Sequence, residues 1–161
     1  MIHSSDRTCL RERLMRQRQS GVTLMELLTV VTVIAILASL AIPSYRRYLL
    51  RAQRSDATTT LLRLQAAQEK HFLQYGVYVT TKASIPNAHS AGGLGLPTVS
   101  ERGYYDVDVA ATGTGYTFTV KPVAGGGQAD DAECRQFTVT ESGTKEARNY
   151  ASAVTTTNCF R

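Results

Sequence analysis

The sequence predicts an α+β protein with a long N-terminal helix and a roughly four-stranded antiparallel sheet. Three observations lead to this fold class: an uncharged apolar run over residues 27–45, a helical repeat of apolar side chains over residues 46–76, and strand-like alternation from residue 104 onward. The hydrophobic half of the helix is expected to protrude, and the amphipathic half to pack on the sheet. At 161 residues the chain has room for one ordinary domain and an anchor, but not for a second large domain.

The apolar run has the length of a membrane span. Its 19 residues approach the roughly 20 that a helix needs to cross the hydrocarbon core. Pro43 lies within the run, where it removes a backbone hydrogen bond and kinks or opens a helix. Glu26 lies at the edge of the run, where the macrodipole of a helix N-terminus favours an acid. A second interpretation is that the Glu26 carboxylate awaits an amine, such as the one that cleavage before Val22 would create.

A basic leader precedes the run, with five arginines and two acids before Gly21. Gly21 is followed by Val-Thr-Leu-Met-Glu-Leu, the rest of the run, and Ala-Ile-Pro-Ser-Tyr at 41–45. Together these residues resemble the type III signal of type IV pilins and pseudopilins, although valine stands where the family usually has phenylalanine. The resemblance implies that prepilin peptidase cuts between Gly21 and Val22 and N-methylates Val22. It also implies that Glu26 neutralises a neighbouring amine during filament assembly, and that Pro43 marks a bend or melted section.

Two other processing schemes stay open. An ordinary secretory signal would be cut after the small-x-small sequence at 39–41 and leave Ile42 first, whereas pilin processing leaves Val22 first. Translation from Met15 would shorten the leader to a compact basic segment. The positive-inside rule gives no orientation, because five arginines also follow the run, at positions 46, 47, 51, 54 and 63.

The patterns and the resemblance divide the chain into segments. The predicted segments are a leader at 1–21, a hydrophobic transmembrane and assembly helix at 22–45, and a globular pilin head at 46–161. Within the head, the prediction is an amphipathic helix at 46–76, a loop region at 77–103 and a β-sheet at 104–161. One face of the amphipathic helix repeats at helical spacing and is interrupted by Gln68. Its predicted core residues are Ala57, Leu61, Leu64, Phe72 and Tyr75.

The strands are predicted from alternation of apolar and polar residues. Val107 and Val109 alternate with aspartates, and an alternating run from Tyr116 to Val120 follows after the hairpin signal Thr-Gly-Thr-Gly at 112–115. A third strand carries Phe137 and Val139 on one face, and Ser-Gly at 142–143 turns the chain into a short final strand.

Three cysteines lie at positions 9, 134 and 159, so removal of the leader leaves two. A C-terminal pair in an exported domain predicts a disulfide between Cys134 and Cys159. The alternative is two free buried thiols in a reducing compartment.

Two charged clusters are interpreted as surface features. The arginines at 46, 47, 51 and 54 are more typical of an interfacial or solvated face than of a phosphate site. The acids at 130, 131 and 133 lack the spacing of an EF-hand, so they are predicted to be solvated turn residues rather than a calcium loop.

No pattern predicts catalysis, a cofactor or a metal site. His3, His71 and His89 fall in the leader, the helix and the loop region, and the HExxH, GxSxG and CxxC spacings are absent from the sequence. The chain is therefore not expected to be an enzyme.

The resemblance is strongest from residue 21 to 78 and closest to PilE-like minor pilins. It implies a structural subunit of a type IV pilus, a minor pilin needed for pilus assembly and thereby for twitching motility, adhesion or DNA uptake. The implied partners are other pilins, prepilin peptidase and the inner-membrane assembly machinery. The implied location is the inner membrane, with the head in the periplasm, and later the extracellular pilus. The alternatives are a type II secretion pseudopilin and a DNA-binding pilus-tip component, with nucleic acid the less favoured partner.

Overall fold

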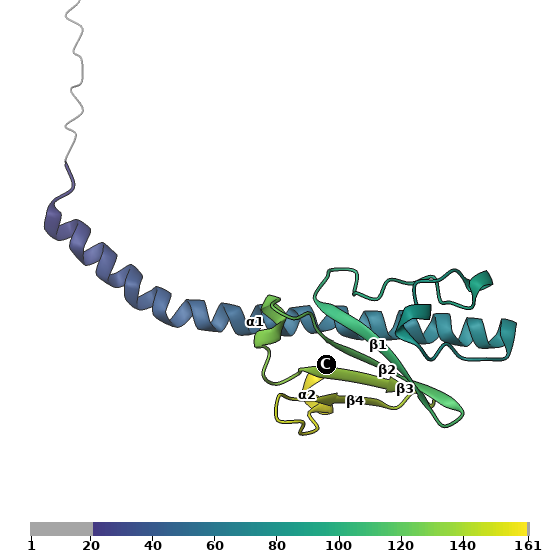
Figure 1. Cartoon of the computed structure of the whole chain (residues 1–161). Coiled ribbons are helices and arrows are strands. Elements are labelled where there is room, and N and C mark those ends of the chain that lie inside the picture. The colour runs from purple at the N-terminus through teal and green to yellow at the C-terminus, as the bar shows by residue number, and fades with distance from the viewer. Residues whose placement is uncertain (1–20, 161) are drawn as a thin grey trace, which may run out of the picture. The chain divides into compact units, whose positions relative to one another are not determined.

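The computed structural model describes residues 21–160, and it confirms an α+β fold with one long helix and a four-stranded antiparallel sheet in the order β1-β2-β3-β4 (Figure 1). The main elements are α1 (Leu24–Tyr75), β1 (Tyr105–Thr112), β2 (Gly115–Pro122), β3 (Gln136–Thr140), β4 (Lys145–Arg148) and the short helix α2 (Thr156–Cys159). Three single-turn 3-10 helices lie in the loops, at Lys82–Ser84, His89–Ala91 and Gly127–Asp130. The alternative start at Met15, together with Cys9 and His3, lies outside the described residues.

The chain forms two compact units that meet between Leu40 and Ala41, and each is described by itself. In the first, α1 begins after Thr23, whose Oγ1 accepts a hydrogen bond from the backbone N–H of Glu26 at 3.1 Å and so caps the helix. Nearly every side chain of α1 up to Leu40 is exposed. By length and composition α1 is apolar enough to cross a membrane, with a mean hydropathy of 2.4 over its most apolar stretch.

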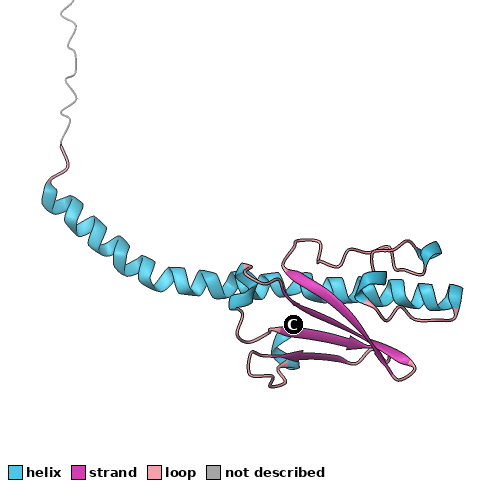
Figure 2. Ribbon diagram, viewed as in Figure 1, coloured by secondary structure: helices cyan, strands magenta, loops and turns pink. Residues whose placement is uncertain are grey.

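In the second unit, α1 continues from Ala41 to Tyr75, and its helical assignment runs through Pro43 without a break. The four strands lie beside this part of α1, and loops connect them at both ends (Figure 2). Alternate side chains of β1, β2 and β3 point toward the helix, since a strand places successive side chains on opposite faces. The hydrophobic core therefore lies between the inner face of the sheet and one stripe of α1. Its largest fully buried aromatic side chains are Tyr105, Tyr116, Phe118 and Phe137.

The stripe of α1 that enters the core differs from the predicted one near its C-terminal end. Ala57, Leu61 and Leu64 are buried as predicted, but Phe72 and Tyr75 are 38% and 49% exposed. Gln68 and His71 take the inner positions instead, because they continue the spacing of three and four residues that keeps one face inward. Both side chains form hydrogen bonds to the loop that follows α1. The Gln68 amide donates to the carbonyl of Val79 at 2.8 Å, and His71 Nδ1 donates to that of Val77 at 2.9 Å.

The sheet has the predicted strands and hairpins. β1 pairs with β2 from Tyr105 opposite Pro122 to Thr112 opposite Gly115, so the hairpin loop is Gly113 and Thr114. Gly113 has φ +61°, a conformation that glycine adopts without the strain of a side chain. The turn between β3 and β4 likewise contains Gly143 at φ +77°.

Candidate nucleic-acid interface

A buried ion pair joins α1 to the loop before β3. Arg54 Nε lies 2.7 Å from Asp131 Oδ2, and Arg54 Nη2 lies 2.8 Å from Asp131 Oδ1, which is the bidentate geometry that suits arginine and a carboxylate. Glu133 accepts a further bond from Arg54 Nη2 at 3.0 Å. Gln128 also donates to Asp131, and the backbone N–H groups of Glu133 and Cys134 complete its shell of donors.

This cluster corrects the interpretation for one residue of each charged group, because Arg54 and Asp131 are buried whereas the other members are exposed as predicted. Arg54 is 7% exposed and Asp131 is 2% exposed, although Arg46, Arg47 and Arg51 are exposed. Burial by itself lowers the pKa of Arg54, but the hydrogen bonds and charges of Asp131 and Glu133 outweigh burial and raise that pKa, so the guanidinium stays charged. The buried charges are tolerated because each one has a partner.

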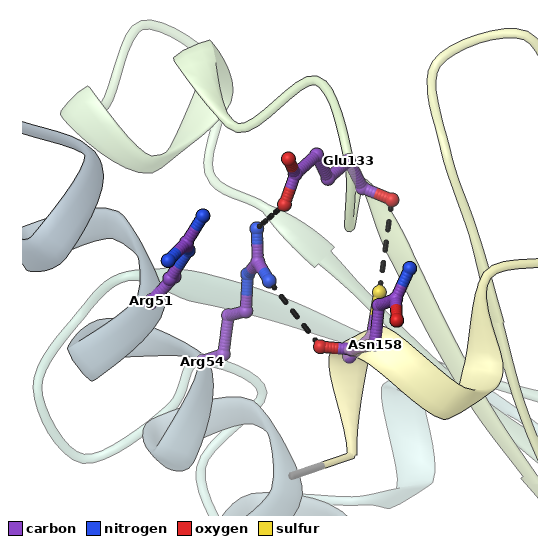
Figure 3. A pocket seen from close by; sticks show the side chains of 5 residues that line it. Arg51, Arg54, Glu133 and Asn158 are labelled. Atoms are coloured by element: carbon purple, nitrogen blue, oxygen red, sulfur yellow. Dashed lines mark hydrogen bonds and ion pairs between the residues drawn. The ribbon is translucent and has the colours of Figure 1, made fainter.

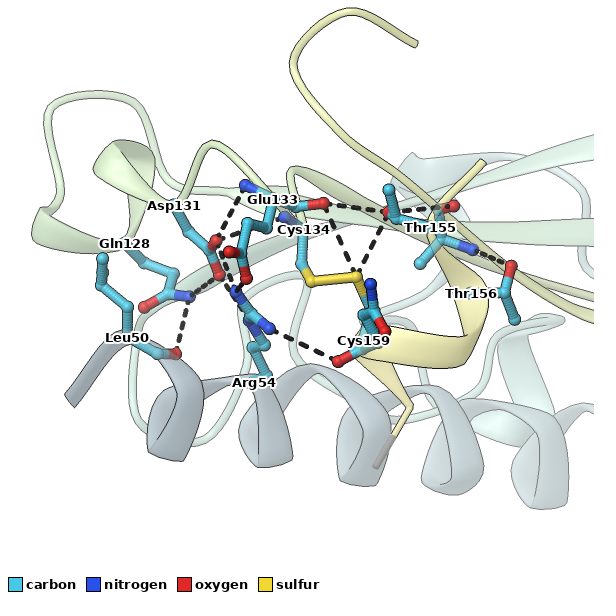
Figure 4. Close-up of a disulfide and its surroundings, with 11 residues drawn as sticks. Leu50, Arg54, Gln128, Asp131, Glu133, Cys134, Thr155, Thr156 and Cys159 are labelled. Carbon is cyan, nitrogen blue, oxygen red and sulfur yellow. Dashed lines mark hydrogen bonds and ion pairs between the residues drawn. A yellow bond between two sulfur atoms is a disulfide. The ribbon is translucent and has the colours of Figure 1, made fainter. Parts of the chain in front are cut away.

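The predicted disulfide joins Cys134 to Cys159, with a Cα–Cα distance of 5.8 Å (Figure 4). It fastens α2 beside the ion pair: the carbonyl of Asn158 lies 3.5 Å from Arg54 Nη1, and Thr155 Oγ1 donates to the carbonyl of Glu133 at 2.9 Å. The C-terminal segment is thereby held against the last strand. Its backbone continues the attachment, because Thr155 N–H donates to the carbonyl of Ala147 at 2.7 Å.

The turn at residues 149–152, between β4 and this C-terminal segment, forms one wall of a polar groove of about 360 Å³ on the second unit. The outward face of the sheet supplies Lys121 from β2, Gln136 from β3 and Arg148 from β4. Gln136 and Arg148 are direct cross-strand partners. The remaining lining residues are Pro122, Arg135, Asn149, Tyr150 and Ser152.

An aromatic ring and three cations share this groove. Tyr150 is 72% exposed, and the guanidinium of Arg135 lies 4.7 Å from the centre of its ring, a cation–π arrangement that orients both side chains. Lys121 and Arg148 are exposed, and Arg148 also pairs with Glu146. Positive charge beside an exposed ring is the composition that nucleic acids contact, through phosphates and through base faces respectively.

The turn over residues 149–153 carries backbone strain at the edge of the groove. Ser152 has φ +62°, and among the described residues other than glycine it alone has a positive φ. Such a conformation costs on the order of 1–3 kcal/mol in sparsely populated regions and persists only where surrounding contacts require it. Here Asn149 Oδ1 accepts from the N–H of Ala153 at 2.9 Å, and the carbonyl of Ser152 accepts from Arg148 Nη1 at 3.3 Å. These hydrogen bonds fix the turn that carries Tyr150, and the second one also orients the side chain of Arg148.

The sequence did not reveal this groove as a site. Alternation in β2, β3 and β4 could have placed Lys121, Gln136 and Arg148 on the outward face, but the strand order that makes them neighbours is a tertiary property. Arg135 and Tyr150 lie outside the strands and show no periodic signal.

The other residues singled out from the sequence are not among those that line the groove. Gly21, Val22 and Glu26 belong to the first unit, and Pro43 lies within α1. His71 is buried on α1, and its ring centre lies 6.3 Å from that of His89. Within residues 21–160, no group of three or more histidine, cysteine, aspartate or glutamate side chains is arranged to hold a metal ion.

Comparison with known proteins gives two family matches and a curated relative. Residues 16–42 match the prokaryotic N-terminal methylation motif, and residues 43–138 match the family described as type IV minor pilin ComP, DNA uptake sequence receptor. The chain is 28% identical over 106 residues to the fimbrial protein EcpC of Eikenella corrodens. The aligned region covers 66% of this chain and 64% of that protein. The chain thus spans less than two thirds of the length of this relative.

The methylation motif and the apolar start of α1 fit anchoring in the inner membrane, followed by entry into a pilus. The minor-pilin match extends over more than half of the chain and includes most of the core, β1, β2, the first part of β3 and the ion pair. A long N-terminal helix beside a four-stranded antiparallel sheet is also the fold that the sequence resemblance implies. The chain belongs to the family of the type IV minor pilin ComP.

Proposed function

We propose that this minor pilin binds DNA during uptake, and that the groove between the outward sheet face and residues 149–152 is the interface. The observation that carries the proposal is the grouping of Lys121, Arg135 and Arg148 around the exposed ring of Tyr150. The family description, which names a DNA uptake sequence receptor, supports the same activity. Together they put the DNA-binding alternative ahead of a purely structural subunit.

The groove offers two kinds of contact. Lys121, Arg135 and Arg148 supply charge for phosphates, which fixes the position of the protein on DNA without reading sequence. Gln136 and Asn149 supply amides, and an amide can make paired hydrogen bonds to adenine in the major groove. Tyr150 supplies a flat face for a base or sugar. Glu146 offsets part of the charge of Arg148, so we expect moderate affinity that depends strongly on salt.

Fluorescence anisotropy with labelled duplex DNA and the full-length chain in uncharged detergent tests the proposal. Lys121→Gln should weaken binding and reduce the slope of log K against log salt by about 0.9, which corresponds to one lost phosphate contact. The matched control is Lys70→Gln, which removes the same charge from an exposed position on α1. Tyr150→Ala should weaken binding with little change in the salt slope, because the ring carries no charge.

Two results would contradict the DNA interface. Equal losses for Lys121→Gln and Lys70→Gln would mean that only net charge matters. Absence of salt-sensitive binding by the unaltered chain would remove DNA binding altogether and leave a structural subunit, or a type II secretion pseudopilin, as the function. A comparison of unrelated duplexes measures how much of the affinity depends on base sequence.

For assembly, we propose that prepilin peptidase cuts between Gly21 and Val22 and methylates Val22, and that Glu26 then pairs with an N-terminal amine of a neighbouring pilin. The support is the signal resemblance and the methylation-motif match. Pro43 is proposed as the point where α1 can bend within a filament. We infer no catalytic activity, and the assembly machinery of the inner membrane is the expected partner.

The assembly proposal is tested by Glu26→Ala in the natural host, with Glu26→Asp as a control that keeps the charge. The alanine variant should be inserted and processed normally but be missing from sheared pili, because the α-amine loses its partner. N-terminal sequencing of the mature chain should begin at Val22. Normal amounts of the alanine variant in sheared pili would refute the role of Glu26, and Ile42 as first residue would refute the cleavage site.

A further inference from the structure

A second polar hollow, of about 390 Å³, lies between α1 and the C-terminal helix α2 (Figure 3). Its lining residues are Arg51, Arg54, Glu133, Asn158 and Cys159. Arg51 and Arg54 come from successive turns of α1 and extend toward the same space. Two cations on one wall make the hollow a candidate site for an anion.

The donors of the two arginines are unequally used. Nε and Nη2 of Arg54 bond to Asp131 and Glu133, while its Nη1 makes only a 3.5 Å contact, with the carbonyl of Asn158. Within the described part of the chain, no carboxylate lies in ion-pair distance of Arg51. The Nη1 group of Arg54 and the unpaired guanidinium of Arg51 can therefore both donate to one phosphate group.

The place of this hollow on α1 indicates the source of the phosphate. Arg51 lies six residues beyond Tyr45, the end of the apolar run, which is about 9 Å of helix rise. Tyr45 and Tyr48 are 62% and 67% exposed, and Arg46 and Arg47 are exposed beside them. Exposed tyrosines and basic residues at the end of an apolar helix are typical of the membrane–water interface, where headgroups lie.

We propose that this hollow binds the phosphate of an anionic phospholipid headgroup while the pilin is stored in the membrane. Arg51, Nη1 of Arg54 and the side-chain amide of Asn158 are the donors. Two acids oppose the anion: Glu133, which is partly neutralised by Arg54, and Asp130, which lines the adjoining hollow with Arg47 and Arg51. The site therefore favours a headgroup supplied at the high local concentration of a membrane over a dilute free anion.

The proposal accounts for arginines that the other sites leave unexplained. Arg54 pairs with Asp131, and Arg63 pairs with Glu101 at 2.6 Å. The other three of the five arginines after the apolar run, Arg46, Arg47 and Arg51, form no ion pair with the described residues. The proposal rests on the inner-membrane location and not on DNA binding, so the two can fail separately.

The test uses the full-length chain in uncharged detergent micelles and follows the arginine side-chain N–H signals by NMR. Phosphatidylglycerol is titrated in, with phosphatidylcholine, inorganic phosphate and duplex DNA in parallel samples. Phosphatidylglycerol should shift the Arg51 and Arg54 signals saturably, phosphatidylcholine should not, and inorganic phosphate should act only at much higher concentration. Arg51→Gln should weaken the phosphatidylglycerol response about fivefold, the equivalent of ~1 kcal/mol per basic residue at an anionic surface.

Arg63→Gln is the matched control, because it removes an exposed arginine from the same helix outside the hollow. It should leave the lipid response unchanged. Equal effects of the two variants would show that net charge alone attracts the lipid and would overturn the site. Inorganic phosphate acting as well as phosphatidylglycerol would overturn the lipid source, and a response of these two arginines to DNA alone would assign the hollow to DNA instead.

Discussion

The ion pair between Arg54 and Asp131 should dominate the stability of the C-terminal half of the head. Replacing Arg54 with methionine keeps an unbranched side chain that can pack along the stem of the arginine, but it leaves the Asp131 carboxylate buried without its cation. Loss of one partner of a buried pair costs about 3–5 kcal/mol. Asp131 keeps three N–H donors, from Gln128 and the backbone of Glu133 and Cys134, so we expect a loss near the lower end, about 3 kcal/mol.

Urea unfolding of the full-length chain in detergent, followed by near-ultraviolet circular dichroism of the tyrosines, measures this loss. The control is Arg63→Met, because Arg63 and Glu101 form an exposed pair that should contribute less than about 1 kcal/mol. The double variant Arg54→Met/Asp131→Asn should recover most of the stability, since it removes both charges while the asparagine Oδ1 can still accept from the backbone N–H groups of Glu133 and Cys134. A loss below about 1 kcal/mol for Arg54→Met, or no recovery in the double variant, would refute the reasoning.

Three further predictions concern the head. Replacing Cys134 and Cys159 together with serine should lower the free energy of unfolding by about 3–4 kcal/mol, as expected for a loop closed over a sequence separation of 25 residues. The same change should weaken DNA binding. Equal DNA affinity with and without reductant would contradict a link between the disulfide and DNA binding. Burial raises the pKa of both Tyr105 and Tyr116. Because the unfolded chain then loses these protons at lower pH than the folded chain, the free energy of unfolding should decline as pH rises above about 10. Spectrophotometric titration of the folded chain checks that the two phenols ionise late. Phe118→Ala should cost about 3–5 kcal/mol in urea unfolding, because the ring is fully buried; a loss under about 1 kcal/mol would mean that the core can close around the gap.

Local patterns were sufficient for the elements of the fold. The apolar run and the alternation around Val107, Phe118 and Phe137 are short-range features, and each predicts its element without knowledge of its neighbours. The disulfide was also predictable, since the predicted leader contains the third cysteine and only one pairing is left. The hydrophobic stripe was misassigned at Phe72 because periodicity alone favours an apolar ring over the polar groups of Gln68 and His71. Those groups are buried because they bond to the loop that returns over the helix.

The sequence by itself determined that this protein has an apolar N-terminal stretch, a long helix and an antiparallel sheet, because hydrophobic period and turn chemistry act over a few neighbouring residues. Only the tertiary structure decided where its charges lie. Arg54 and Asp131 are 77 residues apart in the chain, and a pattern in one segment carries no information about its partner in another. The groove around Tyr150 and the hollow at Arg51 likewise exist only because the disulfide and the strand order bring distant segments together.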